Sequence, residues 1–339
     1  MPLAKLSDLA SPAKTLPSFN PPPRFGQTTF GGYKPQHPSQ QEAMQRTQSF
    51  IASIPLEQSF RWPWQGKQLG QGLYLDGGFG VGKTHLLAAA FNAFGDEHKK
   101  YLSFAELVYV IGALGMAEAK EQLGNAKLYC IDEFELDDPG NTLIVKTFLS
   151  AVFERGGWVI TTSNTPPEAQ GQGRFNATDF KREIQSIAER FGVTTLEGPD
   201  YRKRERLAEP LDQDSLVALI ADEDVAGTKV SASWDELLST LELYHPIRYG
   251  PLLEGVGVLY VSGAEALPSQ NDALRFVHFI DKLYDLKVGL RLAGEVALAD
   301  LFAPSYRDGA YAKKYYRCLS RISELLDEAP SVTADALAG

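Results

Sequence analysis

The chain contains few cysteines, and they show no metal-binding spacing. Cys130 and Cys318 are its only two, and neither Cys-x-x-Cys nor paired Cys/His patterns occur. These absences exclude a disulfide-stapled framework and a structural zinc site, and they are typical of a protein from a reducing compartment.

Long apolar runs are also missing, and acidic residues outnumber basic ones. No segment reaches the roughly 18 apolar residues of a membrane span, and the first residues do not form a signal peptide. We therefore expect a cytoplasmic protein without a membrane span. With 33 Lys and Arg against 43 Asp and Glu, the net charge is −10, so direct binding of nucleic acid is not expected.

The composition that remains is that of a folded protein with room for more than one core. The chain has 339 residues, of which 44% are hydrophobic and 22% charged. This length predicts about two domains. Residues 1–38 are rich in Pro, Gly and Gln and show neither helical nor strand periodicity, so we predict an extended arm there.

The ordered part is predicted to begin with a helix. The sequence SQQE at 39–42 has the form of a capping box, which places the start of this helix at Ser39. Residues 39–205 then alternate apolar strands with helical stretches, as in a parallel sheet covered on both faces. The expected strands are 72–75, 101–103, 127–131, 158–162 and 193–196, and the expected helices are 84–93, 141–154 and 179–190.

A polar stretch at 202–224 leads into a C-terminal portion, residues 206–339, which we also expect to be α/β and to end in a helix. Its expected strands are 257–261 and 288–292, and its expected helices are 273–284 and 310–326. The predicted fold class is therefore α/β throughout.

Residues 77–84, GGFGVGKT, match the phosphate-binding pattern G-x-x-x-x-G-K-[ST] between a predicted strand and a predicted helix. Glycines allow such a P-loop to turn its N–H groups onto phosphates at the positive end of the helix. We expect Lys83 to contact the β and γ phosphates and Thr84 to bind Mg2+. The predicted nucleotide-binding residues are Gly77, Gly78, Phe79, Gly80, Val81, Gly82, Lys83 and Thr84.

A second apolar strand ends in two carboxylates, Asp132 and Glu133. Asp132 is predicted to hold Mg2+ through water, and Glu133 to orient or deprotonate the attacking water. A glutamate at this point favours hydrolysis over transfer to a bound acceptor. The alternative is an ordinary acidic pair at the surface end of a strand.

A third apolar strand, 158–162, ends in Ser163 and Asn164 before TPP at 165–167. Open α/β sheets bind ligands at the carboxyl ends of their strands, so we predict that Asn164 hydrogen-bonds the attacking water or the γ phosphate. The alternative is an asparagine that forms a turn before the prolines.

The two halves of the chain share a pattern. An offset of 131 positions keeps strand, helix and strand in phase and places Tyr129 on Tyr260. Under this alignment Gly263 and Ala264 stand where the first half has its two carboxylates, so a second copy would not bind the same metal. The alternative is a chance likeness between two strand-helix-strand units of similar length.

Several of these runs resemble the ZapE-like ATPases, which are AAA+-related P-loop ATPases of bacterial cell division with mitochondrial relatives. The resemblance lies in GLYLDGGFGVGKTHLL at 72–87, IDEFE at 131–135, TSNTPP at 162–167 and GPDYR at 198–202, and continues in RF at 275–276, IDKLYD at 280–285 and YRCLSRI at 316–322. It implies an AAA+-like P-loop fold, the role called sensor 1 for Asn164, and a protein partner in the division apparatus. The stretch FKREIQSIAER at 180–190 departs from a proline-containing helix found in many relatives.

AAA+-type ATPases usually complete the site with an arginine from a neighbouring subunit. The resemblance therefore implies a homo-oligomer, with Arg182 as the leading candidate and Arg174 and Arg190 behind it. The alternative for each is a solvated charge on a helix face.

The function expected from these patterns is Mg2+-dependent ATP hydrolysis coupled to remodelling of a protein partner, with cell division implied by the resemblance. Two alternatives stay open: a nucleotide-dependent adaptor or loader module, and a P-loop kinase acting on a small molecule.

Overall fold

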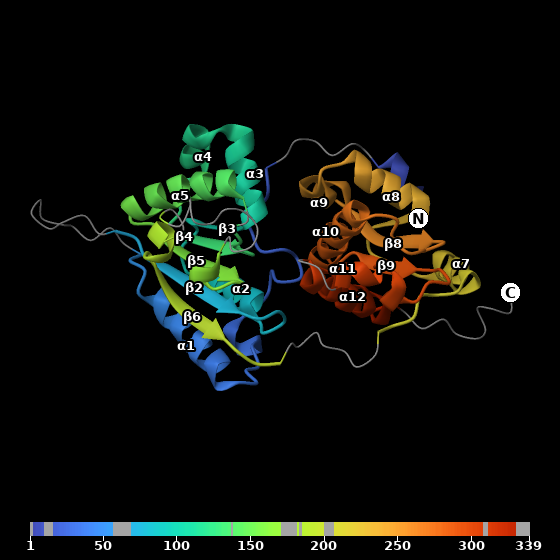
Figure 1. The fold of residues 1–339 in the computed structure, drawn as a ribbon, viewed down its shortest axis with the longest axis horizontal. Coiled ribbons are helices and arrows are strands. Elements are labelled where there is room, and N and C mark those ends of the chain that lie inside the picture. The colour runs from blue at the N-terminus through green and yellow to red at the C-terminus, as the bar shows by residue number, and fades with distance from the viewer. Residues whose placement is uncertain are drawn as a thin grey trace, which may run out of the picture. The chain divides into compact units, whose positions relative to one another are not determined.

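The computed structural model describes residues 3–9, 16–56, 69–136, 138–170, 182, 185–199, 207–307 and 311–329. The chain divides into two compact units: residues 16–201, here called the first unit, and residues 202–339 together with residues 1–15, here called the second unit. Figure 1 shows the helices and strands of both.

The first unit contains a five-stranded parallel sheet in the order β3-β4-β5-β2-β6. Its strands are β2 (Gly72–Gly77), β3 (Lys99–Ser103), β4 (Leu128–Asp132), β5 (Trp158–Ser163) and β6 (Phe191–Leu196). Its helices are α1 (Pro38–Ala52), α2 (Lys83–Ala93), α3 (Phe104–Leu114), α4 (Met116–Leu123) and α5 (Pro139–Glu154), with short 3-10 turns at Phe30–Gly32 and Pro167–Ala169.

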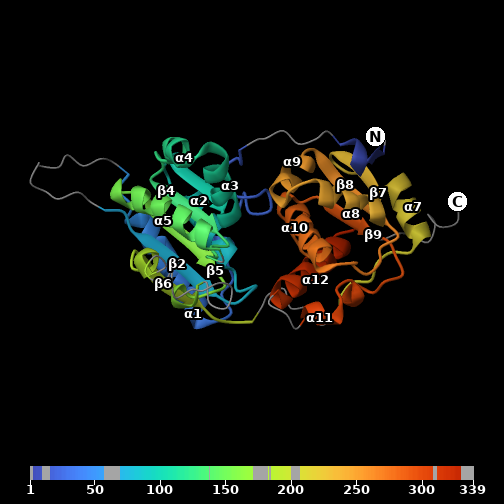
Figure 2. The ribbon, with the colours of Figure 1, turned by 45° about the horizontal axis from the view of Figure 1, so that its top comes forward.

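Both faces of this sheet are covered, because alternate residues of each strand point to opposite sides. On one face Tyr74, Tyr129 and Val159 pack with residues of α3, α4 and α5. On the other face Leu73 and Cys130 pack with residues of α1 and α2. Figures 1 and 2 show α1 and the group α3 to α5 on opposite sides of the strands. The α/β class expected from the sequence is the class observed.

The start of α1 differs from the expected capping box. The N-cap is His37, whose side chain accepts a hydrogen bond from the Ser39 N–H, and Pro38 occupies the first helical turn. The Ser39 hydroxyl instead accepts a hydrogen bond from the Glu197 N–H at 2.8 Å. The capping box predicted at Ser39 is wrong because the Ser39 hydroxyl is hydrogen-bonded to a residue 158 positions away and not to its own helix.

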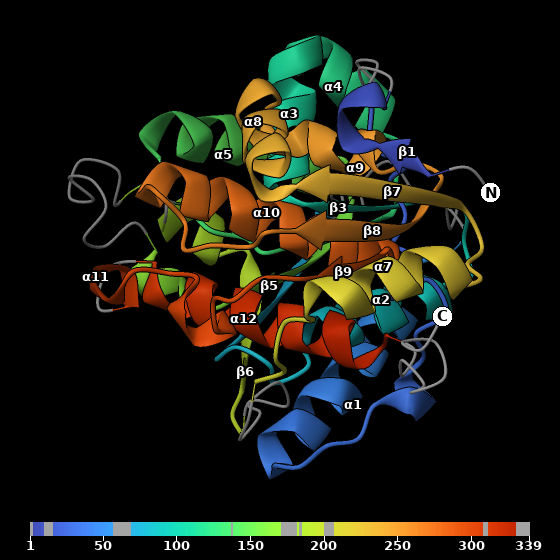
Figure 3. The ribbon, with the colours of Figure 1, turned by 90° about the vertical axis from the view of Figure 1, so that its right-hand side faces the viewer.

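The second unit contains a four-stranded parallel sheet in the order β1-β7-β8-β9 (Figure 3). Its strands are β1 (Ala4–Lys5), β7 (Thr228–Ser233), β8 (Val256–Ser262) and β9 (Gly289–Leu292). Its helices are α7 (Gln213–Asp222), α8 (Trp234–Leu243), α9 (Tyr249–Leu252), α10 (Gln270–Leu286), α11 (Pro304–Arg307) and α12 (Ala312–Asp327), with 3-10 turns at Leu6–Asp8, Pro246–Arg248 and Leu298–Asp300.

The N-terminal residues are not a uniform extended arm. Ala4 and Lys5 pair with Val230 and Ser231 of β7, and Leu6 is buried in the core of the second unit. Residues 16–37 belong to the first unit. The expected arm over residues 1–38 is thus split between two cores, because its scattered apolar residues find partners far away in the sequence.

The two sheets share one layout. An offset of 130 positions takes the parallel pair Ser103 and Asp132 to the parallel pair Ser233 and Ser262. Ser103 caps α3 and Ser233 caps α8 in the same manner. The offset of 131 positions inferred from the sequence is therefore wrong by one residue for β8.

With the corrected offset, Ser262 and Gly263 stand where the first unit has Asp132 and Glu133, so the second unit still has no carboxylate pair there. Leu211 forms an isolated parallel bridge to Ala293, the residue just after β9. Helix α7 begins shortly after Leu211. Leu211 therefore occupies the place of β2, but only Asp212 separates it from α7. The second unit repeats the layout without a P-loop.

Among the described residues, no helix is long and apolar enough to cross a membrane.

Candidate functional site

The phosphate loop is formed where β2 ends and α2 begins. Gly77 has a φ of +152°, and a Cβ added to it would lie 2.3 Å from the Leu196 carbonyl oxygen of β6. A larger residue would therefore push the loop away from the sheet. Gly80 and Gly82 also have positive φ, as the turn requires.

Lys83 connects this loop to the end of β5. Its side chain is buried, and its ammonium group donates hydrogen bonds to the carbonyls of Gly77 and Gly78 and to Asn164 Oδ1, the last at 2.8 Å. A buried ammonium needs such acceptors to offset its lost hydration. The contact brings together two residues, Lys83 and Asn164, that the sequence assigned to the same site.

Asp132 is surrounded by hydroxyl donors at the end of β4. Thr84 Oγ1 lies 3.3 Å from Asp132 Oδ1, and Tyr101 donates to Oδ2 at 3.1 Å. Thr162 donates to Oδ1 as well. Burial raises the pKa of Asp132, and the charge of Glu133 raises it further. The three hydroxyls act in the opposite direction because they stabilise the carboxylate form.

Glu133 has an unusual backbone conformation. Its φ is +54°, a region that few residues other than glycine adopt. Its N–H donates to Asp132 Oδ1 at 3.1 Å and to Thr162 Oγ1 at 3.0 Å, and its side chain is exposed. These bonds stabilise a strained turn directly after the strand, as is common at functional sites.

The loops after β4 and β5 are joined by the buried side chain of Gln170. Its amide nitrogen donates to Ser163 Oγ at 3.0 Å and to the Thr165 carbonyl at 3.2 Å, on either side of Asn164. The same side chain also bonds the Phe134 carbonyl and the Leu136 N–H in the loop after Glu133. Gln170 thereby holds together the two loops that carry Glu133 and Asn164.

The site suits a magnesium ion. Thr84 and Asp132 offer oxygen atoms, which Mg2+ prefers, and Mg2+ retains several waters, so two protein oxygens suffice. Within the described ranges, no cluster of three or more His, Cys, Asp and Glu side chains could hold a metal. Thr84 and Asp132 fit Mg2+ because water and phosphate oxygens can fill its remaining positions.

Two of the three arginine candidates, Arg182 and Arg190, lie among the described residues. Arg182 lies exposed in a helical stretch, and none of the contacts described above involves it. Arg190 is also exposed, and its carbonyl accepts a hydrogen bond from the Gly72 N–H at 3.0 Å. Arg174 lies outside the described residues, as do residues 179–181, 183 and 184 of the expected helix 179–190, whereas residues 185–188 are helical.

The sequence did not assign roles to three residues that the structure brings to this site: Tyr101, Thr162 and Gln170. Tyr101 and Thr162 lie on expected strands, and a polar side chain on a strand that ends at the site is the sequence feature that could have identified them. For Gln170 the sequence offers no signal, since glutamine in a loop is usually solvated.

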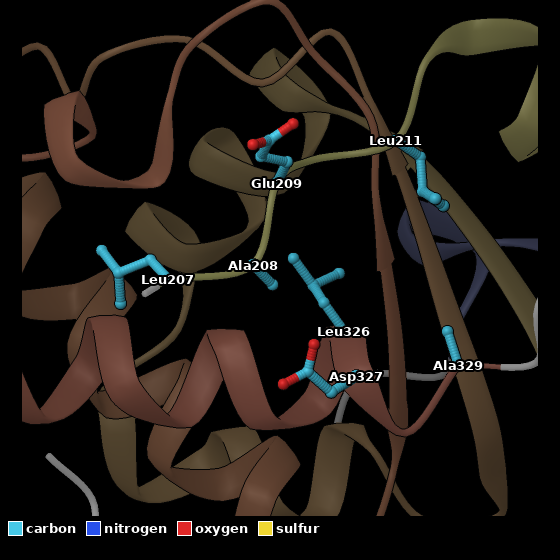
Figure 4. Close-up of a pocket in the computed structure, with 7 residues that line it drawn as sticks. All are labelled: Leu207, Ala208, Glu209, Leu211, Leu326, Asp327 and Ala329. Carbon is cyan, nitrogen blue, oxygen red and sulfur yellow. The ribbon is translucent and has the colours of Figure 1, made fainter. Parts of the chain in front are cut away.

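A pocket of about 360 Å3 lies within the second unit, apart from these residues (Figure 4). It is lined by Leu207, Ala208, Glu209, Leu211, Leu326, Asp327 and Ala329. None of them belongs to the P-loop or to the ends of β4 and β5.

The sequence model of one protein family covers most of the chain. It is described as AFG1-like ATPase and matches residues 18–245 and 240–330. The chain belongs to the AFG1-like ATPase family. The family resemblance drawn from the sequence is thereby confirmed, and membership of this family supports nucleotide binding and ATPase activity.

Individual relatives of this AFG1-like chain are similar at modest identity. Cell division protein ZapE of Escherichia coli (strain K12) is 25% identical over 302 residues, which cover 76% of this chain and 78% of that protein. Lactation elevated protein 1 homolog B of Danio rerio is 26% identical over 189 residues, covering 49% of this chain and 37% of that protein. Among solved structures, domain III of the Thermotoga maritima replication initiation protein DnaA matches with a TM-score of 0.39 and 19% identity, over 53% of this chain and 70% of that one.

Proposed function

We propose that this chain hydrolyses ATP with Mg2+ in the cytoplasm and uses the reaction to remodel a protein partner. The proposal of a cell division partner rests on the similarity to ZapE, a cell division protein. The observation that carries the proposed hydrolysis is the pair of contacts Lys83 to Asn164, at 2.8 Å, and Thr84 to Asp132, at 3.3 Å. They join the P-loop to the ends of the two neighbouring strands.

Each residue has a role in this proposal. Lys83 and the N–H groups of residues 77–84 hold the phosphates. Thr84 and Asp132 hold Mg2+, which when bound neutralises charge on the transferring phosphoryl group. Glu133 orients or deprotonates the attacking water, and Asn164 hydrogen-bonds that water or the γ phosphate.

The arginine that stabilises the transition state comes, in this proposal, from a neighbouring copy of the chain. Arg182 is the leading candidate because it is exposed and helical, and Arg174 and Arg190 remain the next ones. An arginine in trans makes activity depend on assembly.

The test is phosphate release from ATP, measured against protein concentration, for the parent chain, Glu133→Gln and Arg182→Ala. We expect activity per molecule to rise with concentration and each single variant to lose activity by about a hundredfold or more. A mixture of the two variants should regain activity, because the intact Glu133 of one copy then meets the intact Arg182 of another. Concentration-independent activity that survives Arg182→Ala would reject the shared site.

The same assay addresses the alternative functions. A parent chain that binds ATP without releasing phosphate would favour the adaptor or loader. Phosphate release without any added acceptor would exclude the small-molecule kinase.

A further inference from the structure

The segment of residues 25–33, here called the strap, follows one side of α2. Asn92 Nδ2 donates to the carbonyls of Phe25, at 3.3 Å, and Thr28, at 2.8 Å. His85 comes directly after the P-loop, and its Nε2 lies 3.0 Å from the Thr29 carbonyl oxygen. His85 and Asn92 are separated by about two helical turns, so they lie on the same face of α2. The strap is thus anchored at two heights along the P-loop helix.

The strap ends at Tyr33, which contacts the P-loop itself. Its hydroxyl donates to the Val81 carbonyl at 2.9 Å, and the residue is only 7% exposed. Its ring centroid lies 5.3 Å from that of His85. A Cβ added to Gly82 would lie 2.5 Å from the Tyr33 ring, so the ring packs directly on this glycine.

The hydrogen bond to Val81 has a consequence for the next N–H group. The Val81 carbonyl and the Gly82 N–H belong to one planar trans peptide, in which they point in opposite directions. Holding the carbonyl toward Tyr33 therefore turns the Gly82 N–H away from Tyr33. Gly82 has a φ of +90°, and glycine at such an angle moves easily unless its neighbours restrain it.

We infer that Tyr33 is a positioning residue for the P-loop. It orients the Val81–Gly82 peptide so that the Gly82 N–H can donate a hydrogen bond to the β phosphate of the nucleotide. The role concerns the phosphates and not the base, because the contact is made to the loop backbone. The inference rests on the proposed nucleotide binding and adds to it a restraint that lies 44 residues before the P-loop motif begins.

The experiment compares Tyr33→Phe with Tyr129→Phe. Tyr129 is a matched control because its buried hydroxyl also donates to a backbone carbonyl, that of Leu123, in the same unit. Both variants keep the ring and lose one hydrogen bond. Equilibrium dissociation constants for ATP, ADP and AMP are measured, together with KM and kcat for ATP hydrolysis and thermal unfolding.

For Tyr33→Phe we expect the dissociation constants of ATP and ADP to rise about five- to tenfold, as the loss of one hydrogen bond predicts. KM should rise by a similar factor, with a smaller change in kcat and none in AMP affinity, because AMP has no β phosphate. Tyr129→Phe should bind all three nucleotides like the parent chain, while both variants lose similar thermal stability.

Three results would overturn the inference. One is unchanged ATP affinity in Tyr33→Phe, and another is an equal loss of affinity in Tyr129→Phe. A loss for AMP as large as that for ATP would assign Tyr33 to the base instead. If the parent chain bound neither ATP nor ADP, the proposed function would fail as well, whereas normal binding by the parent and by Tyr33→Phe would reject the inference alone.

Discussion

The two sheets of this protein differ most where their strands end. In the first unit, β4 ends at Asp132 and Glu133 follows it, and the P-loop connects β2 to α2. In the second unit the corresponding positions hold Ser262 and Gly263, and only Asp212 separates Leu211 from α7. Asp212 accepts a hydrogen bond from the Ser215 N–H at 2.7 Å and so caps α7, whereas the N-cap of α2 in the first unit is Gly82, which has no side chain to do so.

This comparison separates what the shared layout requires from what the chemistry requires. Glu133 and Gly263 both have positive φ after their strands, so the turn belongs to the layout. A glutamate in that conformation is strained, whereas a glycine is not. Of these two turns, only the one after β4 is strained, which is the expected pattern if Glu133 acts on the nucleotide.

The largest expected effect comes from Lys83 of the first unit, with Lys229 of the second unit as the control. Lys83→Ala should reduce ATP hydrolysis by about a thousandfold and weaken ATP binding, because a buried positive charge at the phosphates is lost. Lys229, whose ammonium donates to the Ile220 carbonyl at 3.0 Å, has a structural partner instead. Lys229→Ala should leave ATP binding unchanged in a titration, and weakened binding in this variant would mean that the second unit contributes to the nucleotide site.

The next largest effect concerns the glutamates after β4 and β8. Glu133→Gln should lower phosphate release by about a hundredfold or more while ATP affinity stays within a factor of about two, because only the step at the attacking water is affected. Glu265→Gln is the control, since Glu265 is exposed in the loop after β8. Equal losses in both variants would contradict the assigned role.

A third change tests whether the buried charges of the second unit are structural. Asp281 forms ion pairs with Arg317 and Arg321 between α10 and α12. Asp281→Asn removes the buried carboxylate that the two arginines share and should lower the free energy of unfolding by about 3 to 5 kcal/mol in urea titrations. Asp235→Asn, on an exposed first turn of α8, should cost less than about 1 kcal/mol.

The same ion pairs predict a pH dependence of stability. Burial raises the pKa of Asp281, but the charges of Arg317 and Arg321 outweigh it and hold the pKa well below its usual range. The resulting stabilisation is complete above about pH 4, the range of an unfolded aspartate, and is lost as the pH falls further. Asp281→Asn should therefore flatten the stability profile between about pH 4 and 2, and a profile unchanged from the parent would show that other groups cause the acid dependence.

The smallest effect compares two adjacent threonines of β5. Thr162 binds Asp132 and the Glu133 N–H, whereas the Thr161 hydroxyl donates to the Ile131 carbonyl at 2.9 Å, within the sheet. Thr162→Val should lower the rate of hydrolysis by about tenfold with little change in ATP affinity, because it loosens the carboxylate pair. Thr161→Val should affect stability alone, and similar rates in the two variants would argue against positioning by Thr162.

The sequence by itself determined the elements whose signals are local. The P-loop and the apolar strands of the first unit can be predicted from residues that are neighbours in the sequence. The bounds of β2, β4 and β5 lie within two residues of the predicted ones. The proximity of Asp132 and Asn164 to the P-loop could also be predicted from the sequence, because the carboxyl ends of parallel strands share one edge of a sheet.

Only the tertiary structure decided the contacts between distant segments. Ala4 and Lys5 pair with β7, and the N-cap of α1 is His37 and not Ser39. Tyr33, Tyr101 and Gln170 lie at the candidate site although they are distant in the sequence from the residues that they contact there. The physical reason is that each contact depends on a partner chosen by packing and hydrogen-bond geometry over tens to hundreds of residues. Periodicity in the chain does not specify such partners.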